Sequence, residues 1–139
     1  MRFSTMSILI DTNVFCAYAN TEDVHHDKAK RIMEAVRSKQ YGVAITVDGV
    51  FGETMAVMER RVNRKVAREF GHYLLNSEIA MAYTNKMVFE ITWRLFDQAF
   101  KLSFTDCLCL AFMNVLHIDQ IATFDKEFKR IKDVKVIDY

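Results

Sequence analysis

Five short apolar segments constrain the fold of this chain more than any other feature of its sequence. They are continuous rather than alternating, as strands are when both faces of their sheet are covered, and they span residues 7–10, 42–47, 79–83, 119–123 and 134–137. The intervening segments predict helices over about 12–20, 25–40, 49–62, 63–76, 86–101 and 104–117, with a short one near 126–130. The pattern therefore predicts an α/β fold in three layers, with a central, mostly parallel sheet of about five short strands flanked by helices.

Nothing in the sequence divides the chain into parts. Its 139 residues include no proline, only four glycines and no low-complexity linker, and a hydrophobic content of 51% is enough to fill one core. We therefore expect a single domain over residues 1–139.

Charge and cysteine content limit the classes of partner and compartment. The formal net charge is +1, so no global field draws the chain to nucleic acid or to an anionic membrane, and any polyanion site must be a local patch. Cys16, Cys107 and Cys109 are odd in number and lie in apolar stretches, as reduced thiols do. The apolar run that begins at Met6 ends at Asp11, which is too short for a signal peptide or a membrane span. We expect a cytoplasmic protein that does not contact a membrane.

Two carboxylates directly follow predicted strands. Asp11 lies in "SILIDTNVFCAYAN" and Asp125 in "IATFDKEF". In a parallel sheet, the ligand crevice lies at the carboxyl ends of the strands, so both are candidates for chemistry. Each is equally well explained as a helix N-cap, and a cap does not exclude chemistry.

Two further carboxylates lie on predicted helices. Ser103 and Asp106 in "SFTDCLCLAFMNVLH" form a capping box, but the helix that follows is apolar almost all round, which makes Asp106 costly without a partner. Glu53 in "VDGVFGETMAVMERR" falls at the edge of an apolar arc; the alternative is that it extends to water or pairs with Arg60.

Carboxylates brought together repel one another unless they take up protons or a cation joins them. Oxygen ligands favour Mg²⁺ or Mn²⁺. Zinc is disfavoured because the adjacent His25 and His26 cannot share a helix face, and Cys107 and Cys109 point away from each other.

Four segments together resemble the PIN domain, and within it the single-domain ribonucleases of the VapC toxin type. They are "ILIDTNVFCAYAN", the lone glutamate of "VFGETMAVM", "LSFTDCLCLAFM" and "IATFDKEFKRI", in that order over nearly the whole chain. The resemblance implies a PIN-like fold and a metal-dependent nuclease site built from Asp11, Glu53, Asp106 and Asp125.

The resemblance also implies a role for each residue. Asp11 and Asp106 would bind Mg²⁺, with Mn²⁺ as the alternative, directly, and Glu53 and Asp125 would bind it directly or through water. Thr12, Asn13 and Thr123 would support the acidic residues. Asp48 departs from the family pattern, which has a small polar residue before the glutamate helix, and as a further carboxylate it could crowd the pocket.

The expected reaction is hydrolysis of an RNA phosphodiester, in which a metal-activated water attacks phosphorus in line and expels the 3′-oxygen. The segment "ERRVNRKVAREF" offers a local basic patch for the substrate; its residues are Arg60, Arg61, Arg64, Lys65 and Arg68. These residues are equally well explained as the solvated face of a helix.

Three alternatives to a toxin ribonuclease stay open. Phosphoaspartate enzymes also place an aspartate after the first strand, but no "DxDxT" follows it here. A catalytically silent PIN-like binding module would keep the fold without activity, although all four acidic positions are present. A PIN nuclease for RNA processing or structured nucleic acid would differ only in its substrate.

A toxin of this type implies two protein partners. One is a VapB-like antitoxin that inserts a segment into the acidic pocket, and the other is a second copy of the chain in a homodimer. The stretch "MVFEITWRLF" could form the dimer face, although core helix is the commoner explanation.

Overall fold

The computed structural model describes residues 6–98 and 101–139. One five-stranded sheet lies at its centre, with strands in the order β3-β2-β1-β4-β5 and every neighbouring pair parallel. The strands are β1 (Ser7–Ile10), β2 (Val43–Val47), β3 (Ala80–Ala82), β4 (Gln120–Ala122) and β5 (Lys135–Ile137). The expected sheet of five short strands is confirmed, and it is wholly parallel.

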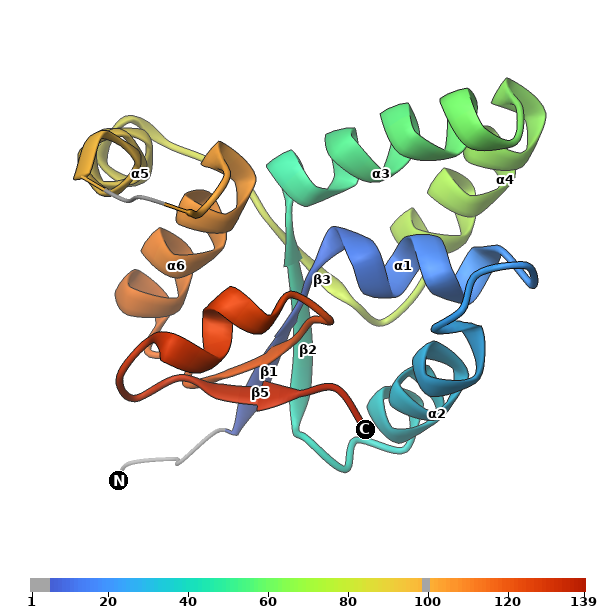
Figure 1. Cartoon of the computed structure of the whole chain (residues 1–139), viewed down its shortest axis with the longest axis horizontal. Coiled ribbons are helices and arrows are strands. Elements are labelled where there is room, and N and C mark those ends of the chain that lie inside the picture. The colour runs from blue at the N-terminus through green and yellow to red at the C-terminus, as the bar shows by residue number, and fades with distance from the viewer. Residues whose placement is uncertain (1–5, 99–100) are drawn as a thin grey trace.

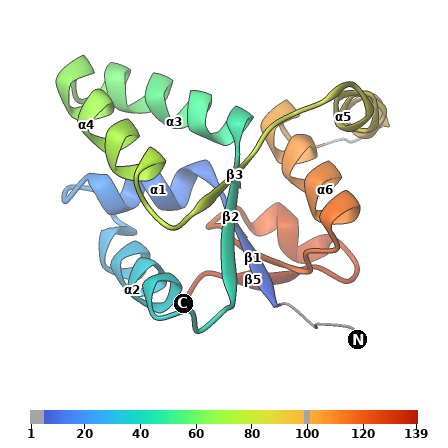
Figure 2. The same cartoon turned by 180° about the vertical axis from the view of Figure 1, so that it is seen from behind.

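In the described part of the chain, six α-helices and one 3₁₀ helix surround the sheet. They are α1 (Thr12–Ala19), α2 (His26–Arg37), α3 (Asp48–Arg61), α4 (Arg64–Leu75), α5 (Lys86–Gln98), α6 (Phe104–Leu116) and η1 (Lys126–Arg130). Figures 1 and 2 show α1, α2 and α4 to one side of β1 and β2, with α5 and α6 to the other. The predicted α/β fold with helix layers on both faces is therefore confirmed.

Two predicted helices are longer than the helices that the structure describes. The helix expected over 25–40 ends at Arg37 because Lys39 takes a left-handed backbone conformation, with a φ of 61° that continues no helix. The helix expected over 86–101 is described as far as Gln98, and residues 99 and 100 lie outside the described residues.

The central strand β1 is buried over most of its length. Ile8, Leu9 and Ile10 are fully buried, and Leu9 is paired with Ile45 of β2 on one side and Ile121 of β4 on the other. A strand enclosed in this way needs apolar side chains on both faces, which is why its sequence does not alternate. The first polar side chain after this strand belongs to Asp11, so the carboxyl end of the sheet is where polar groups first meet the core.

The helices of the described part are all too short or too polar to cross a membrane.

Candidate active site

The structure brings the four predicted carboxylates into one pocket at the carboxyl ends of β1 and β4. The pocket has a volume of about 370 Å³ and is lined by Asp11, Thr12, Asn13, Cys16, Glu53, Val57, Arg61, Ser103, Asp106 and Asp125. These residues come from α1, α3, α6 and the segments that follow β1 and β4. Segments distant in the sequence therefore meet at the edge of the sheet where parallel α/β folds bind ligands.

Asp11 lies deepest among the four carboxylates. Its side chain accepts hydrogen bonds from the backbone N–H of Thr12 and from the Thr123 hydroxyl, each at 2.8 Å. Burial raises its pKa to about 7, and the carboxylates of Asp106 and Glu53 add to the rise, while the two hydrogen bonds oppose it. Asp11 is thus both the N-cap of α1 and a carboxylate held in the pocket, so the two sequence interpretations are compatible.

The Thr123 hydroxyl links three parts of the site. It donates to Asp11 Oδ2 and accepts from Asn13 Nδ2 and from the backbone N–H of Asp125, both at 3.1 Å. Asn13 Oδ1 in turn accepts from the backbone N–H of Phe124 at 3.1 Å. Asn13 and Thr123 therefore fix the segment that carries Asp125.

Asp106 forms the predicted capping box with Ser103. The Ser103 N–H donates to Asp106 Oδ2 at 3.0 Å, and the Asp106 N–H donates to Ser103 Oγ at 3.1 Å. Burial raises the pKa of Asp106, with further contributions from Asp125 and Glu53, and the Ser103 hydrogen bonds oppose the shift. The cap holds the carboxylate at the pocket wall rather than excluding it from chemistry.

Glu53 is held by α6 and not by its own helix. Its Oε2 accepts from the Thr105 hydroxyl at 3.0 Å, which joins α3 to the start of α6 beside Asp106. The ion pairs within 4.0 Å in residues 6–98 and 101–139 include none between Glu53 and Arg60. The proposed pairing of Glu53 with Arg60 is therefore wrong.

Asp48 does not crowd the pocket. Its carboxylate accepts from the Thr84 N–H at 2.9 Å, from the Thr84 hydroxyl at 2.6 Å and from the Gly49 N–H at 2.9 Å. These bonds tie the start of α3 to the segment after β3, so this departure from the family pattern has a structural role.

The donor groups of the pocket fit a hard divalent cation. Four carboxylates provide oxygen ligands, and the Thr12 hydroxyl beside Asp11 is a buried side-chain oxygen without a hydrogen-bond partner among the described residues. In that same part of the chain, no three His, Cys, Asp or Glu side chains are close enough to hold an ion as they stand. The raised pKa values of Asp11 and Asp106 show the electrostatic cost that a cation would relieve.

The basic patch is divided between two sites. Arg64, Lys65 and Arg68 line a hollow of about 330 Å³ on α4, and Arg64 also pairs with Glu59 at 2.8 Å. Arg61, by contrast, lines the acidic pocket. The sequence interpretation missed this position of Arg61, although Glu53, Val57 and Arg61 are four residues apart on one helix face, and it also missed Thr105.

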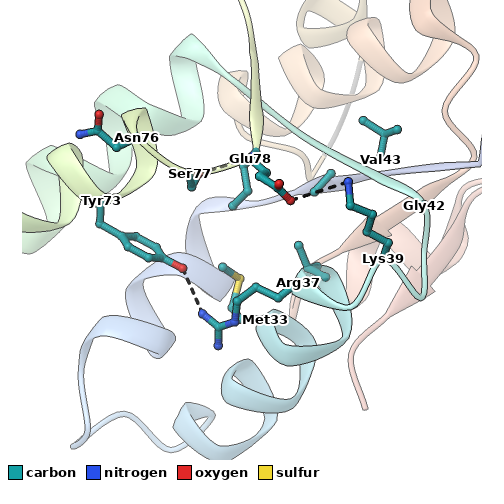
Figure 3. Close-up of a pocket in the computed structure, with 12 residues that line it drawn as sticks. Met33, Arg37, Lys39, Gly42, Val43, Tyr73, Asn76, Ser77 and Glu78 are labelled. Atoms are coloured by element: carbon teal, nitrogen blue, oxygen red, sulfur yellow. Dashed lines mark hydrogen bonds and ion pairs between the residues drawn. The ribbon is translucent and has the colours of Figure 1, made fainter.

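A larger pocket, of about 430 Å³, lies apart from the carboxylates, between α2, α4 and the start of β2. Figure 3 shows Arg37 reaching the Tyr73 hydroxyl at 3.3 Å and Lys39 paired with Glu78 at 3.7 Å beside it. Its lining also includes the apolar side chains of Met33 and Val43. Since the acidic side chains with raised pKa values all line the smaller pocket, the smaller pocket is the candidate for catalysis.

Four aromatic side chains form an exposed surface on α5 and the start of α6. Phe89 and Phe96 each lie against Phe104, with ring centroids 6.0 and 5.6 Å apart, and Trp93 lies 6.1 Å from Phe96. Trp93 and Phe89 are each 52% exposed. We call these four residues the aromatic face; the core-helix explanation does not account for them.

Residues 8–134 match the PIN domain family, so this chain belongs to that family. Among curated proteins it is similar to the 23S rRNA-specific endonuclease VapC20 of Mycobacterium tuberculosis, with 26% identity over 132 residues, which are 93% of this chain and 97% of the relative.

Solved structures share the fold at lower sequence identity. The crystal structure of the sarcin-ricin loop cleaving toxin VapC20 of M. tuberculosis has a TM-score of 0.80 at 24% identity and covers 88% of this chain and 93% of its own. VapBC2 of Rickettsia felis, bound to promoter DNA, has a TM-score of 0.68 at 13% identity over 94% and 97% of the two chains. VapBC-1 of nontypeable Haemophilus influenzae has a TM-score of 0.65 at 17% identity and covers 96% of this chain and 98% of its own.

The raised pKa of Asp11 predicts a pH-dependent gain in stability when its charge is removed. The folded-state pKa of about 7 exceeds the ordinary value of 3.8, so the free energy of unfolding falls as pH rises between these values and stays low above them. In chelator-treated protein, we expect Asp11→Asn to be more stable than wild type at pH 8 by on the order of 1–3 kcal/mol, with the difference vanishing near pH 4.

Thermal or urea unfolding at the two pH values measures this difference. Asp133→Asn is the matched control, because Asp133 is exposed with a φ of 66°, a conformation that asparagine also adopts. An equal effect of Asp11→Asn at pH 4 and pH 8 would contradict the assignment.

Proposed function

We propose that this protein is a divalent-metal-dependent endoribonuclease and the toxin of a type II toxin-antitoxin pair. The convergence of Asp11, Glu53, Asp106 and Asp125 in one pocket carries the proposal. Support comes from membership of the PIN domain family and from similarity to a relative named as a 23S rRNA-specific endonuclease.

The proposed metal is Mg²⁺, with Mn²⁺ as an alternative. Asp11 and Asp106 would bind it directly, with Glu53 and Asp125 bound directly or through water. When bound, such a cation polarises a phosphoryl oxygen and lowers the pKa of a water ligand. Hard oxygen donors support this choice, as does the Thr12 hydroxyl, which has no hydrogen-bond partner within residues 6–98 and 101–139.

The side chains around the carboxylates hold them in place for this chemistry. Thr123 orients Asp11, Ser103 orients Asp106 and Thr105 orients Glu53. These hydrogen bonds exist in the free protein, so each carboxylate is already held at the pocket wall, and the carboxylates have only to draw closer together around a cation.

The expected protein partners are a VapB-like antitoxin and a second copy of the chain, in the cytoplasm. The VapBC complexes that share the fold support the antitoxin. The three cysteines are buried and form no disulfide, which agrees with a reducing compartment.

Metal binding and RNA cleavage together test the proposed function. We expect Mn²⁺ or Mg²⁺ to raise the melting temperature of wild type, with a stabilisation of about 2.7 kcal/mol at 100 times the Kd, and to leave Asp106→Asn unaffected. With Mn²⁺ and total cellular RNA, wild type should produce discrete fragments, and Asp11→Asn and Asp106→Asn should lose cleavage by at least about 100-fold.

Asp119→Asn is the control, because Asp119 is an exposed carboxylate outside the pocket. A metal response without cleavage by wild type would identify a silent binding module. Full cleavage by Asp106→Asn would contradict the site.

We also propose that Arg60, Arg61, Arg64, Lys65 and Arg68 contact RNA phosphates. Replacing Arg64 and Lys65 with glutamine should reduce the slope of log Kd against log salt by about 1.4, since each single-strand phosphate contact contributes about 0.7. The measurement uses Asp106→Asn protein to prevent cleavage. Lys28→Gln with Lys30→Gln, an exposed pair on α2, should leave the slope unchanged, and an unchanged slope in the α4 variant would refute the contact.

We propose the aromatic face as the homodimer interface. A charge placed among these rings would be desolvated on association, so Trp93→Asp should shift the protein from dimer to monomer in analytical ultracentrifugation. Val24→Asp changes an apolar side chain that is 91% exposed on another surface and should stay dimeric. A wild-type monomer at micromolar concentration would exclude the interface.

A further inference from the structure

Arg61 differs from the other basic residues near the site because it lines the catalytic pocket itself. Glu53, Val57 and Arg61 occupy one face of α3 at intervals of four residues, and all three border the pocket with Asp11 and Asp106. Among the described residues that line this pocket, Arg61 alone carries a positive charge. The helix that supplies a carboxylate to the site thus supplies a cation two turns later.

The Arg61 guanidinium is free to bind an incoming anion. Within the described ranges, no ion pair shorter than 4.0 Å involves Arg61, even though four carboxylates line the same pocket. Arg64, one turn further along, is already paired with Glu59. Arg61 therefore keeps its hydrogen-bond donors available, and its side chain is exposed at the rim.

The charge of Arg61 affects the pKa of the Cys16 thiol, which lies on α1. Burial raises the pKa of the Cys16 thiol to about 11, and Arg61 is the neighbouring charge that acts most strongly against this rise. Cys16 lines the acidic pocket and a smaller adjoining hollow, and Arg61 borders both. Arg61 therefore lies near Cys16 of α1, at the border of both hollows.

We infer that Arg61 binds a non-bridging oxygen of the scissile phosphate and stabilises the charge that grows there during hydrolysis. This inference rests on the proposed nuclease function. As the bond from the water oxygen to phosphorus forms, the water gives up a proton to solvent. The bond from phosphorus to the 3′-oxygen breaks, and that oxygen leaves with the bonding electron pair and takes up a proton from solvent. Negative charge gathers on the phosphoryl oxygens during this step. The Arg61 guanidinium offers a planar pair of donors to these oxygens.

An acidic pocket needs such a group for an electrostatic reason. A phosphodiester carries a negative charge and is repelled by the four carboxylates, so a cation from the protein on the open side lowers the cost of its approach. Arg60, Arg64, Lys65 and Arg68 do not line the pocket, and they would contact flanking phosphates instead. Arg61 should therefore govern the rate of cleavage after binding, whereas the others govern affinity.

Single-turnover cleavage tests the inference, with enzyme in saturating excess over total cellular RNA and Mn²⁺ present. We expect Arg61→Ala to cleave about 100- to 1,000-fold more slowly than wild type at saturation, and Arg61→Lys to recover only part of the rate because lysine lacks the planar fork. Guanidinium ion at tens of millimolar should partly restore Arg61→Ala. Arg31→Ala, which removes an exposed arginine from α2, should cleave at the wild-type rate with and without guanidinium.

Two further measurements separate this role from folding and metal binding. Arg61→Ala should keep the wild-type melting temperature and its rise with Mn²⁺, because Arg61 has no partner in the described structure whose loss would weaken the fold. If Arg61→Ala cleaves at the wild-type rate at saturation, or differs from wild type only in its affinity for RNA, the inference about Arg61 is overturned. Cleavage by wild type in the same experiment would still uphold the proposed function. If wild type does not cleave with bound Mn²⁺, the proposed function fails and the inference falls with it.

Discussion

Burial of the Asp11 carboxylate at the end of the central strand is the constraint on which the rest of the site depends. A carboxylate this deep, 3% exposed, is tolerated only where hydrogen bonds replace water, and here the Thr12 N–H and the Thr123 hydroxyl do so. Since Thr123 follows β4, the same bond joins the ends of two neighbouring strands. Asn13 and Asp125 then attach to Thr123, so one hydroxyl sets the positions of several polar groups.

The site keeps an electrostatic cost that the fold does not remove. Asp11 and Asp106 both have raised pKa values because of burial and neighbouring carboxylates, although each also receives hydrogen bonds that act in the opposite direction. A fold selected for stability alone would place an uncharged residue at position 11. The cost is mainly that of burying charge, with a smaller part from the neighbouring carboxylates, and a bound divalent cation would offset both.

The basic residues near this acidic pocket lie at two places. Arg61 borders the pocket, and Arg64, Lys65 and Arg68 lie beyond it on α4. A chain with a net charge of +1 can therefore present a local path for a polyanion without a strong overall field. The turn from α3 into α4 separates the two groups, because α3 ends at Arg61, beside the pocket, and α4 begins at Arg64, outside it.

The sequence by itself determined the succession of strands and helices along the chain and the parallel character of the sheet. It also singled out the four carboxylates that line the pocket. Continuous apolar runs such as residues 7–10 can be satisfied only between two helix layers, and an aspartate at the end of such a run has few places to lie. The tertiary structure decided which groups meet. Thr105 reaches Glu53 and Asp48 reaches Thr84 across 52 and 36 residues, and no local pattern encodes those distances. Arg61 borders the acidic pocket because the packing of α3 against α1 and α6 fixes the rotation of that helix, and this rotation is a property of the assembled core rather than of the segment.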